Sequence, residues 1–368
     1  MKLLRKMLYT AVALTILAAI GILATVARVE KYCVAAGPPA VVTSDFGIDD
    51  DGYARAQGDS FLTFPEWYIV HAYSDLAGMA EGASESDFDY LASIRGFWSS
   101  LCDATRQASH SGPASIDQKV TNYIIGFSFT VEMGLMGVYE KTIGALTELT
   151  TGGKKTAEDA FNAALLKEYA AFLHQTPWFR FPFGPKLRQF WRETPFIAST
   201  RSIERRGSLS LQYASRYAYA ALMRFIAGYD PADLTIRSVV GGMTRSELEA
   251  MRGVKVICEV ADMSGARGVL VKTARYAQFD AFVRELGLHP GASLLEVAGN
   301  HRILVSMVVP ERVDPKLAAA DGVVIFQLPI QSLPGLRRIG IDMPIRSLVQ
   351  DVKGFDAAGY QFEHAYDY

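Results

Sequence analysis

The sequence has few cysteines: Cys33, Cys102 and Cys258 are the only three among its 368 residues. They are odd in number, far apart in the chain, and contain no C-x-x-C pair. This spacing excludes the disulfide framework of a small secreted domain and a zinc site built from cysteine. One long-range disulfide would be possible in an oxidising compartment, but the spacing identifies no pair, and we expect buried free thiols instead.

The sequence also has little net charge, −2 at pH 7. A near-neutral chain is not typical of a dedicated nucleic-acid-binding protein, so we expect no nucleic-acid partner. The sequence lacks the serine-hydrolase motif G-x-S-x-G, the metalloprotease motif H-E-x-x-H, a glycine-rich dinucleotide loop and a complete calcium loop. These absences leave no support for a cofactor or a resident metal ion, and we expect neither.

Charges of one sign are nevertheless concentrated in two segments. Residues 45–103 hold 12 acidic residues and only two basic ones, whereas residues 180–206 hold seven basic residues and only two acidic ones. We expect these opposite charges to pair with each other inside the molecule, since segments of opposite charge in one chain most often do so. A site for an anionic lipid headgroup or another polyanion is the alternative.

Long uncharged apolar runs are scarce as well, with one clear exception at residues 7–27. A helix of this length spans roughly 30 Å, the thickness of the hydrocarbon core of a bilayer. Lys2, Arg5 and Lys6 precede the run, so the positive-inside rule predicts a cytoplasmic N-terminus and a periplasmic or extracellular C-terminal bulk. We therefore predict a single-pass signal-anchor helix. A cleaved signal peptide is the alternative, although the run exceeds the usual h-region length.

The rest of the chain divides by composition into three parts. Residues 28–60 are linker-like, with a G-P-P sequence and a cluster of aspartates and glycines. Residues 61–229 hold 28 of the 41 aromatic residues and all four tryptophans, and their periodicity predicts a helical domain. Residues 230–368 predict a small mixed α+β domain. The predicted fold class is therefore α+β, preceded by a transmembrane helix.

The helical part predicts helices over 63–79, 84–108, 115–149, 156–174 and 208–226. The stretch 120–139 has Glu132 as its only charge, and a second membrane span there is an alternative to the central helix of a bundle. Its glycines would allow close packing between helices.

Residues 177–195 combine four prolines with many aromatic residues, so one continuous helix is excluded. We expect a loop packed over the bundle. Stacking of arginine on aromatic rings also makes this segment a candidate binding surface for a membrane or a protein partner, formed by Arg180, Arg188, Trp191 and Arg192.

The last part predicts strands over 254–260, 268–273 and 323–328, with helices over 276–286 and 345–352. Gly299 and Asn300, between two apolar segments, predict a hairpin with a two-residue turn. A small sheet with one or two helices on one face accounts for this pattern.

Three polar side chains on the first predicted helix are the leading catalytic candidates. His71 and Asp75 are four residues apart and can present an acid/base or metal pair, with Glu66 one to two turns away. His174 is a further candidate. Glu363, His364 and Asp367 can also ligate a divalent metal, although a docked or frayed tail is the simpler interpretation.

These features favour a membrane-anchored protein that faces away from the cytoplasm. We expect a binding or assembly module of the cell envelope, with the bilayer as partner and a protein as a candidate second partner. A membrane-anchored hydrolase or metal-dependent enzyme using His71, Asp75 and Glu66 is the alternative.

Overall fold

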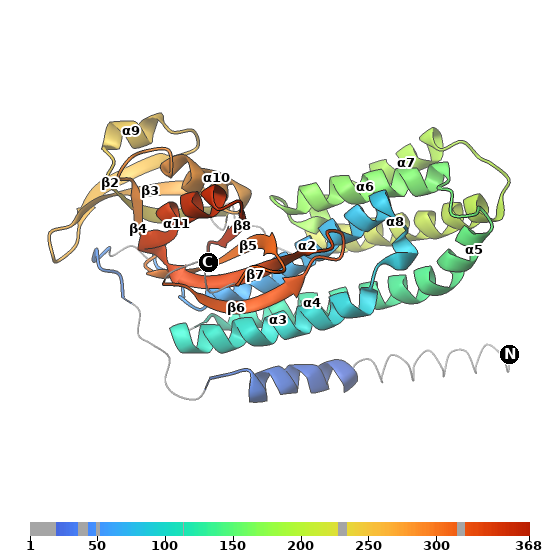
Figure 1. Cartoon of the computed structure of the whole chain (residues 1–368), viewed down its shortest axis with the longest axis horizontal. Coiled ribbons are helices and arrows are strands. Elements are labelled where there is room, and N and C mark those ends of the chain that lie inside the picture. The colour runs from blue at the N-terminus through green and yellow to red at the C-terminus, as the bar shows by residue number, and fades with distance from the viewer. Residues whose placement is uncertain (1–19, 36–42, 49–51, 113, 227–233, 315–320) are drawn as a thin grey trace.

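The computed structural model describes residues 20–35, 43–48, 52–112, 114–226, 234–314 and 321–368. A helical N-terminal part is followed by two small antiparallel sheets, which confirms the mixed α+β class (Figure 1). Most of the predicted anchor, residues 7–19, lies outside the described residues; residues 20–27 belong to a helix that ends at residue 32. Among the residues described, no helix is long and apolar enough to span a membrane.

The helices largely follow the predicted pattern. They are α2 (Asp59–Gly82), α3 (Tyr90–Ser111), α4 (Ile116–Tyr139), α5 (Ala145–Leu149), α6 (Ala157–Leu173), α7 (Phe183–Glu193) and α8 (Thr200–Ile226). Side chains cap several N-termini: Asp89 caps α3, Ser115 caps α4, and Thr156 forms a capping box at α6.

Two segments differ from the predicted pattern. A π-helical turn, Glu140–Gly144, joins α4 to α5, so the predicted long helix is continuous but irregular. The segment predicted to be a loop contains the short helix α7.

Close packing between α3 and α4 depends on two glycines. A Cβ atom at Gly126 would lie 2.3 Å from the Phe97 ring, and one at Gly137 would lie 2.8 Å from Cβ of Tyr90. These two positions confirm the predicted close approach of helices. Gly134 has open space around it, so it does not serve this purpose.

The second part holds two four-stranded antiparallel sheets, ordered β2-β3-β1-β4 and β6-β7-β5-β8. Their strands are β1 (Thr235–Gly241), β2 (Lys255–Ala261), β3 (Arg267–Ala274), β4 (Ser293–Val297), β5 (Arg302–Pro310), β6 (Val323–Pro329), β7 (Leu336–Pro344) and β8 (Gln361–Tyr366). The helices of this part are α9 (Arg245–Ala250), α10 (Ala277–Leu286) and α11 (Ile345–Ala357). Apolar residues from both sheets, α10 and α11 form one core. The expectation of a single small sheet was therefore wrong.

The predicted hairpin at Gly299 and Asn300 was also wrong. Strand β4 pairs with β1, whereas β5 pairs with β7 and β8, so the turn connects two different sheets. Only an isolated bridge, Val297 to Asn300, joins the two segments directly. Strand β5 lies between β7 and β8 in the second sheet, and almost every one of its residues is buried.

Helix α2 joins the helical part to the second sheet (Figure 1). The Phe64 ring stacks on Phe326 of β6 with ring centroids 3.9 Å apart. The Ser60 hydroxyl donates to the carbonyl of Tyr366 over 2.7 Å and accepts from the backbone N–H of Leu304 over 3.0 Å. The two parts therefore share apolar and polar contacts, and they pack as neighbours along α2.

Candidate functional site

Helix α2 places His71 against the last strand, β8. Nε2 of His71 lies 3.4 Å from Oε2 of Glu363, whose carboxylate accepts two hydrogen bonds from Arg338, at 2.5 and 2.7 Å. Burial, together with the positive charge of Arg338, lowers the pKa of His71 well below its usual value. The Arg338 guanidinium outweighs the cost of burying Glu363 and lowers the pKa of that carboxyl to about 2. His71 is thus a neutral, buried imidazole beside an ionised carboxylate.

Three of the six histidines gather around Trp67 of the same helix. The His364 ring stacks on Trp67 with centroids 3.6 Å apart, and its Nδ1 lies 2.5 Å from Oδ2 of Asp280. Nε2 of His364 is buried and has no hydrogen-bond partner among the described residues. His174 packs edge-on against Trp67, and burial lowers its pKa. His71, His174 and His364 were predicted as separate candidates; the fold brings them into one cluster around Trp67.

The other two catalytic candidates lie elsewhere on α2. Asp75 accepts hydrogen bonds from the Ser332 hydroxyl over 2.8 Å and the Gln331 backbone N–H over 3.2 Å, and burial raises its pKa. Burial also raises the pKa of Glu66, which interacts with Arg275 rather than with His71. The three side chains have separate partners, so their joint catalytic role stays a prediction.

The tail is docked, which is one of the two arrangements in the simpler interpretation of the sequence. Glu363 and His364 lie in strand β8, which pairs with β5. Among the described residues, the group of side chains that could hold a metal ion does not include them. Asp367 is fully buried beside Arg275, with 3.5 Å between Oδ1 and Nε.

The arginine and tryptophan candidates are divided between packing and exposure. Nε1 of Trp191 donates to the Ser210 hydroxyl of α8 over 2.9 Å, and the Arg206 guanidinium lies over the Trp191 ring. Arg192 is exposed and pairs with its neighbour Glu193. Arg188 is exposed as well, and Arg180 lies in the short 3-10 turn before α7. Their combined role as a binding surface stays a prediction.

A buried ionic network in the helical bundle was not predicted as a site. Arg205 of α8 donates to Asp159 over 2.7 Å and to Glu140 over 2.8 Å, and it also pairs with Glu85. Arg201 donates to the same Asp159 carboxylate over 2.9 Å. The pairing of Glu85 with Arg205 joins the acidic segment to the basic one, which confirms at this position the prediction that their charges meet.

The same network shifts the protonation of its acids in opposite directions. Burial raises the pKa of Glu140 to about 7, against the opposing effect of Arg205. For Asp159, Arg205 and the Thr156 backbone outweigh burial and lower the pKa. A cavity of about 20 Å³ borders Glu85, Asp159 and Arg205, which is room for about one water molecule. The network therefore has the properties of a structural ion cluster with little space for a substrate.

One group of side chains has the geometry of a metal site. Ligand atoms of Asp45, Glu296 and His301 all lie within 4.8 Å of one another. Glu296 is already fully engaged, since it accepts hydrogen bonds from Ser44, Tyr53 and the backbone of Asp45. Nε2 of His301 lies 3.2 Å from Asp45 and 3.5 Å from Glu296, and the contact with Glu296 raises the pKa of His301, which favours an ion pair within the group.

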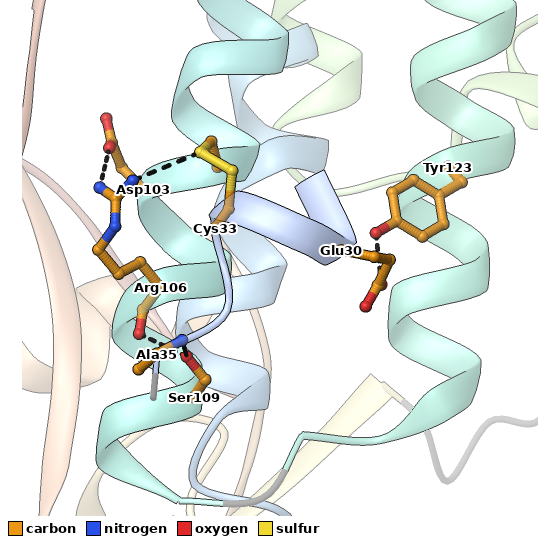
Figure 2. The surroundings of a disulfide bond; sticks show 8 residues. Glu30, Cys33, Ala35, Asp103, Arg106, Ser109 and Tyr123 are labelled. Atoms are coloured by element: carbon orange, nitrogen blue, oxygen red, sulfur yellow. Dashed lines mark hydrogen bonds and ion pairs between the residues drawn. A yellow bond between two sulfur atoms is a disulfide. The ribbon is translucent and has the colours of Figure 1, made fainter. Parts of the chain in front are cut away.

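A disulfide fastens the short helix that ends at residue 32 to the bundle (Figure 2). Cys33 is bonded to Cys102 of α3, with 5.0 Å between the Cα atoms, and Cys258 is free and exposed. The expectation of buried free thiols was therefore wrong, because the fold brings two cysteines 69 residues apart into contact. Glu30 adds polar contacts, accepting a hydrogen bond from Tyr123 over 2.6 Å and pairing with Lys119 over 3.3 Å.

Comparison with known proteins gives no relative: the chain matches no protein-family model, no curated protein and no solved structure.

Proposed function

We propose that the chain is a single-pass membrane protein whose folded body faces away from the cytoplasm and serves as a binding or assembly module of the cell envelope. The observation that carries this proposal is the disulfide between Cys33 and Cys102. Disulfides persist in oxidising compartments and are rare in the cytosol. Cys33 follows the apolar run by only a few residues, so an oxidised Cys33 is expected close to the outer surface of the membrane.

The orientation inferred from charge agrees with this placement. Lys2, Arg5 and Lys6 before the run favour a cytoplasmic N-terminus, which puts Cys33 on the opposite side. Two independent features, basic residues and a disulfide, thus support the same topology.

A binding role is favoured over catalysis because the candidate catalytic groups and the carboxylate beside His71 are each engaged with structural partners elsewhere in the fold. Glu363 is held by Arg338, and Asp75 accepts hydrogen bonds from Ser332 and Gln331. His71 is 2% exposed, so a substrate in solution would have little access to its imidazole.

Topology can be tested with a membrane-impermeant maleimide on intact spheroplasts. Exposed Cys258 should be labelled from outside, whereas a cysteine introduced by Lys2→Cys should be labelled only after lysis. Denatured but unreduced protein should show one free thiol out of three. Labelling of the residue-2 cysteine alone in intact spheroplasts, or recovery of the full-length chain in a carbonate-washed soluble fraction, would refute the proposal.

A further inference from the structure

Helix α4 exposes an uninterrupted row of large apolar side chains. From Val120 to Val138, every exposed residue is apolar. The exposed fraction reaches 69% at Leu135 and 70% at Val138. We call this row, together with its continuation on the π-turn and α5, the α4–α5 stripe; it consists of Val120, Ile124, Phe127, Val131, Leu135, Val138, Ile143, Leu146 and Leu149.

This pattern reverses that of an ordinary surface helix, which presents polar residues to water. The neighbouring helix α3 shows the ordinary pattern, since Arg95, Ser99 and Arg106 are at or near its surface. The acids of α4 and its π-turn do not disturb the stripe: Glu132 is paired with Arg216, and Glu140 is buried with Arg205. An exposed apolar surface of this extent marks an interaction site.

We propose that the α4–α5 stripe packs against the lipid bilayer. The folded body would then contact the membrane surface directly, in addition to being attached through the N-terminal helix. This inference rests on the proposed anchor. The stripe begins beside the point where the apolar run reaches the body, because Glu30 contacts Tyr123 near the start of α4 (Figure 2). Glu30 also pairs with Lys119 of the same helix. The Cys33–Cys102 disulfide fixes the chain at the same place.

The dimensions also favour lipid over a cover supplied by the chain itself. The stripe extends for about 45 Å at 1.5 Å per residue. In the proposed topology residues 7–27 cross the bilayer, and a segment that crosses the bilayer is not free to cover this surface as well. Helix α8, which pairs with α4 through Arg216 and Glu132, also exposes Leu211, Leu222 and Phe225. A broad apolar solvent accommodates two such helices without a matching partner surface.

Lipid contact can be measured on the full-length protein in nanodiscs. In a Cys258→Ser background, an environment-sensitive fluorophore is placed at Leu135→Cys or Val138→Cys. Matched control labels are placed at Lys167→Cys on α6, which lies on the other side of the bundle (Figure 1), and at Met263→Cys beyond β2. All four positions are exposed, so each label is expected to leave the fold intact.

Nitroxide-labelled lipids should quench the two stripe labels several-fold more than the two controls. A Leu135→Lys substitution should lower quenching at residue 138, whereas Leu135→Ala should leave it largely unchanged. Equal quenching at stripe and controls would overturn the proposal. So would stripe labels that are shielded from both lipid nitroxide and aqueous iodide, because a second copy or another protein would then cover the stripe.

The two proposals fail in distinguishable ways. The chain could stay in the membrane after a carbonate wash while the stripe labels are unquenched. This result would support the anchor and refute lipid contact by the stripe. If the chain leaves the membrane and no label is quenched, both proposals fall.

Discussion

Arg205 and Asp159 are joined by a hydrogen bond of 2.7 Å from Nε to Oδ1, inside the helical bundle. Glu85 and Glu140 share the same guanidinium, so removing it leaves these two buried carboxylates without their cation, whereas Asp159 keeps Arg201. We expect Arg205→Met to lower the free energy of unfolding by about 3–5 kcal/mol. Urea denaturation of the full-length protein in detergent measures this loss.

Arg192 provides the matched control for this substitution. It is also an arginine in an ion pair, but its side chain is 75% exposed and its partner is the adjacent Glu193. We expect Arg192→Met to change stability by less than about 1 kcal/mol. Equal effects at the two positions would show that the buried network is not a major source of stability.

Glu140 should make the protein less stable as pH rises. Its pKa is raised to about 7 in the folded state from 4.5, so the folded state binds this proton more tightly than the unfolded state. The stabilisation is complete below pH 4.5 and is lost as pH rises through about 7. Denaturation midpoints measured between these pH values should show this loss in the native protein and not in Glu140→Gln. A variant with an unchanged slope would contradict the assignment.

His71 should act in the opposite direction. Its folded pKa lies well below 6.5, so the unfolded state takes up the proton first. The contribution to stability is present above pH 6.5 and is lost as pH falls toward the lower folded pKa. We expect His71→Gln to flatten this acidic limb, while His110→Gln on the exposed side of α3 leaves it in place. Loss of an enzymatic activity in a stably folded His71→Gln protein would instead favour the catalytic alternative.

Local signals in the sequence located most helices. Ser115 and Thr156 precede apolar periodicity, and in the structure both act as N-caps of helices predicted there. Helix α7 was missed because its prolines suggested a loop, although Pro185 lies in its first turn, where proline is tolerated. The periodicity of α4 was visible, but the sequence did not show which of its apolar residues face outward.

Long-range pairing could not be read in the same way. Glu85 and Arg205 are 120 residues apart, and only the opposite charges of their segments suggested a contact. Strand β8 was missed because its polar residues are typical of a chain end in contact with water. In the structure these side chains have charged partners far away in the sequence: Glu363 pairs with Arg338, and His364 pairs with Asp280. The hairpin prediction failed because both strands that pair with β5 are distant in the sequence. Strand β7 begins more than 25 residues after β5 ends, and β8 lies further still along the chain.

The two glycine environments of α4 allow an internally controlled substitution. Gly126→Ala would place a methyl group 2.3 Å from the buried Phe97 ring, and overpacking of this kind typically costs about 1–3 kcal/mol. Gly134→Ala meets no atom within 4 Å, so the better helix propensity of alanine should stabilise the protein by about 0.5–1 kcal/mol. Opposite signs in thermal denaturation are expected. A stabilising effect of Gly126→Ala would show that α3 and α4 do not pack closely at Gly126, and a destabilising effect of Gly134→Ala would show that residue 134 lacks open space.

The disulfide should stabilise the body as well as attach it. It closes a loop of 69 residues, and loss of a native disulfide typically costs about 2–4 kcal/mol through the entropy of the unfolded chain. We expect Cys102→Ser to lower the free energy of unfolding by this amount, and Cys258→Ser, at an exposed free thiol, to leave it nearly unchanged. Reduction of the native protein should reproduce the Cys102→Ser value.

The reactivity of Cys33 gives a second measurement of the same bond. Cys33 is released from its partner in the Cys102→Ser variant and in the reduced protein, so it should react with an alkylating reagent only in these two cases. A native protein that already shows three reactive thiols when isolated under non-reducing conditions would remove both the bond and the main support for an oxidising location.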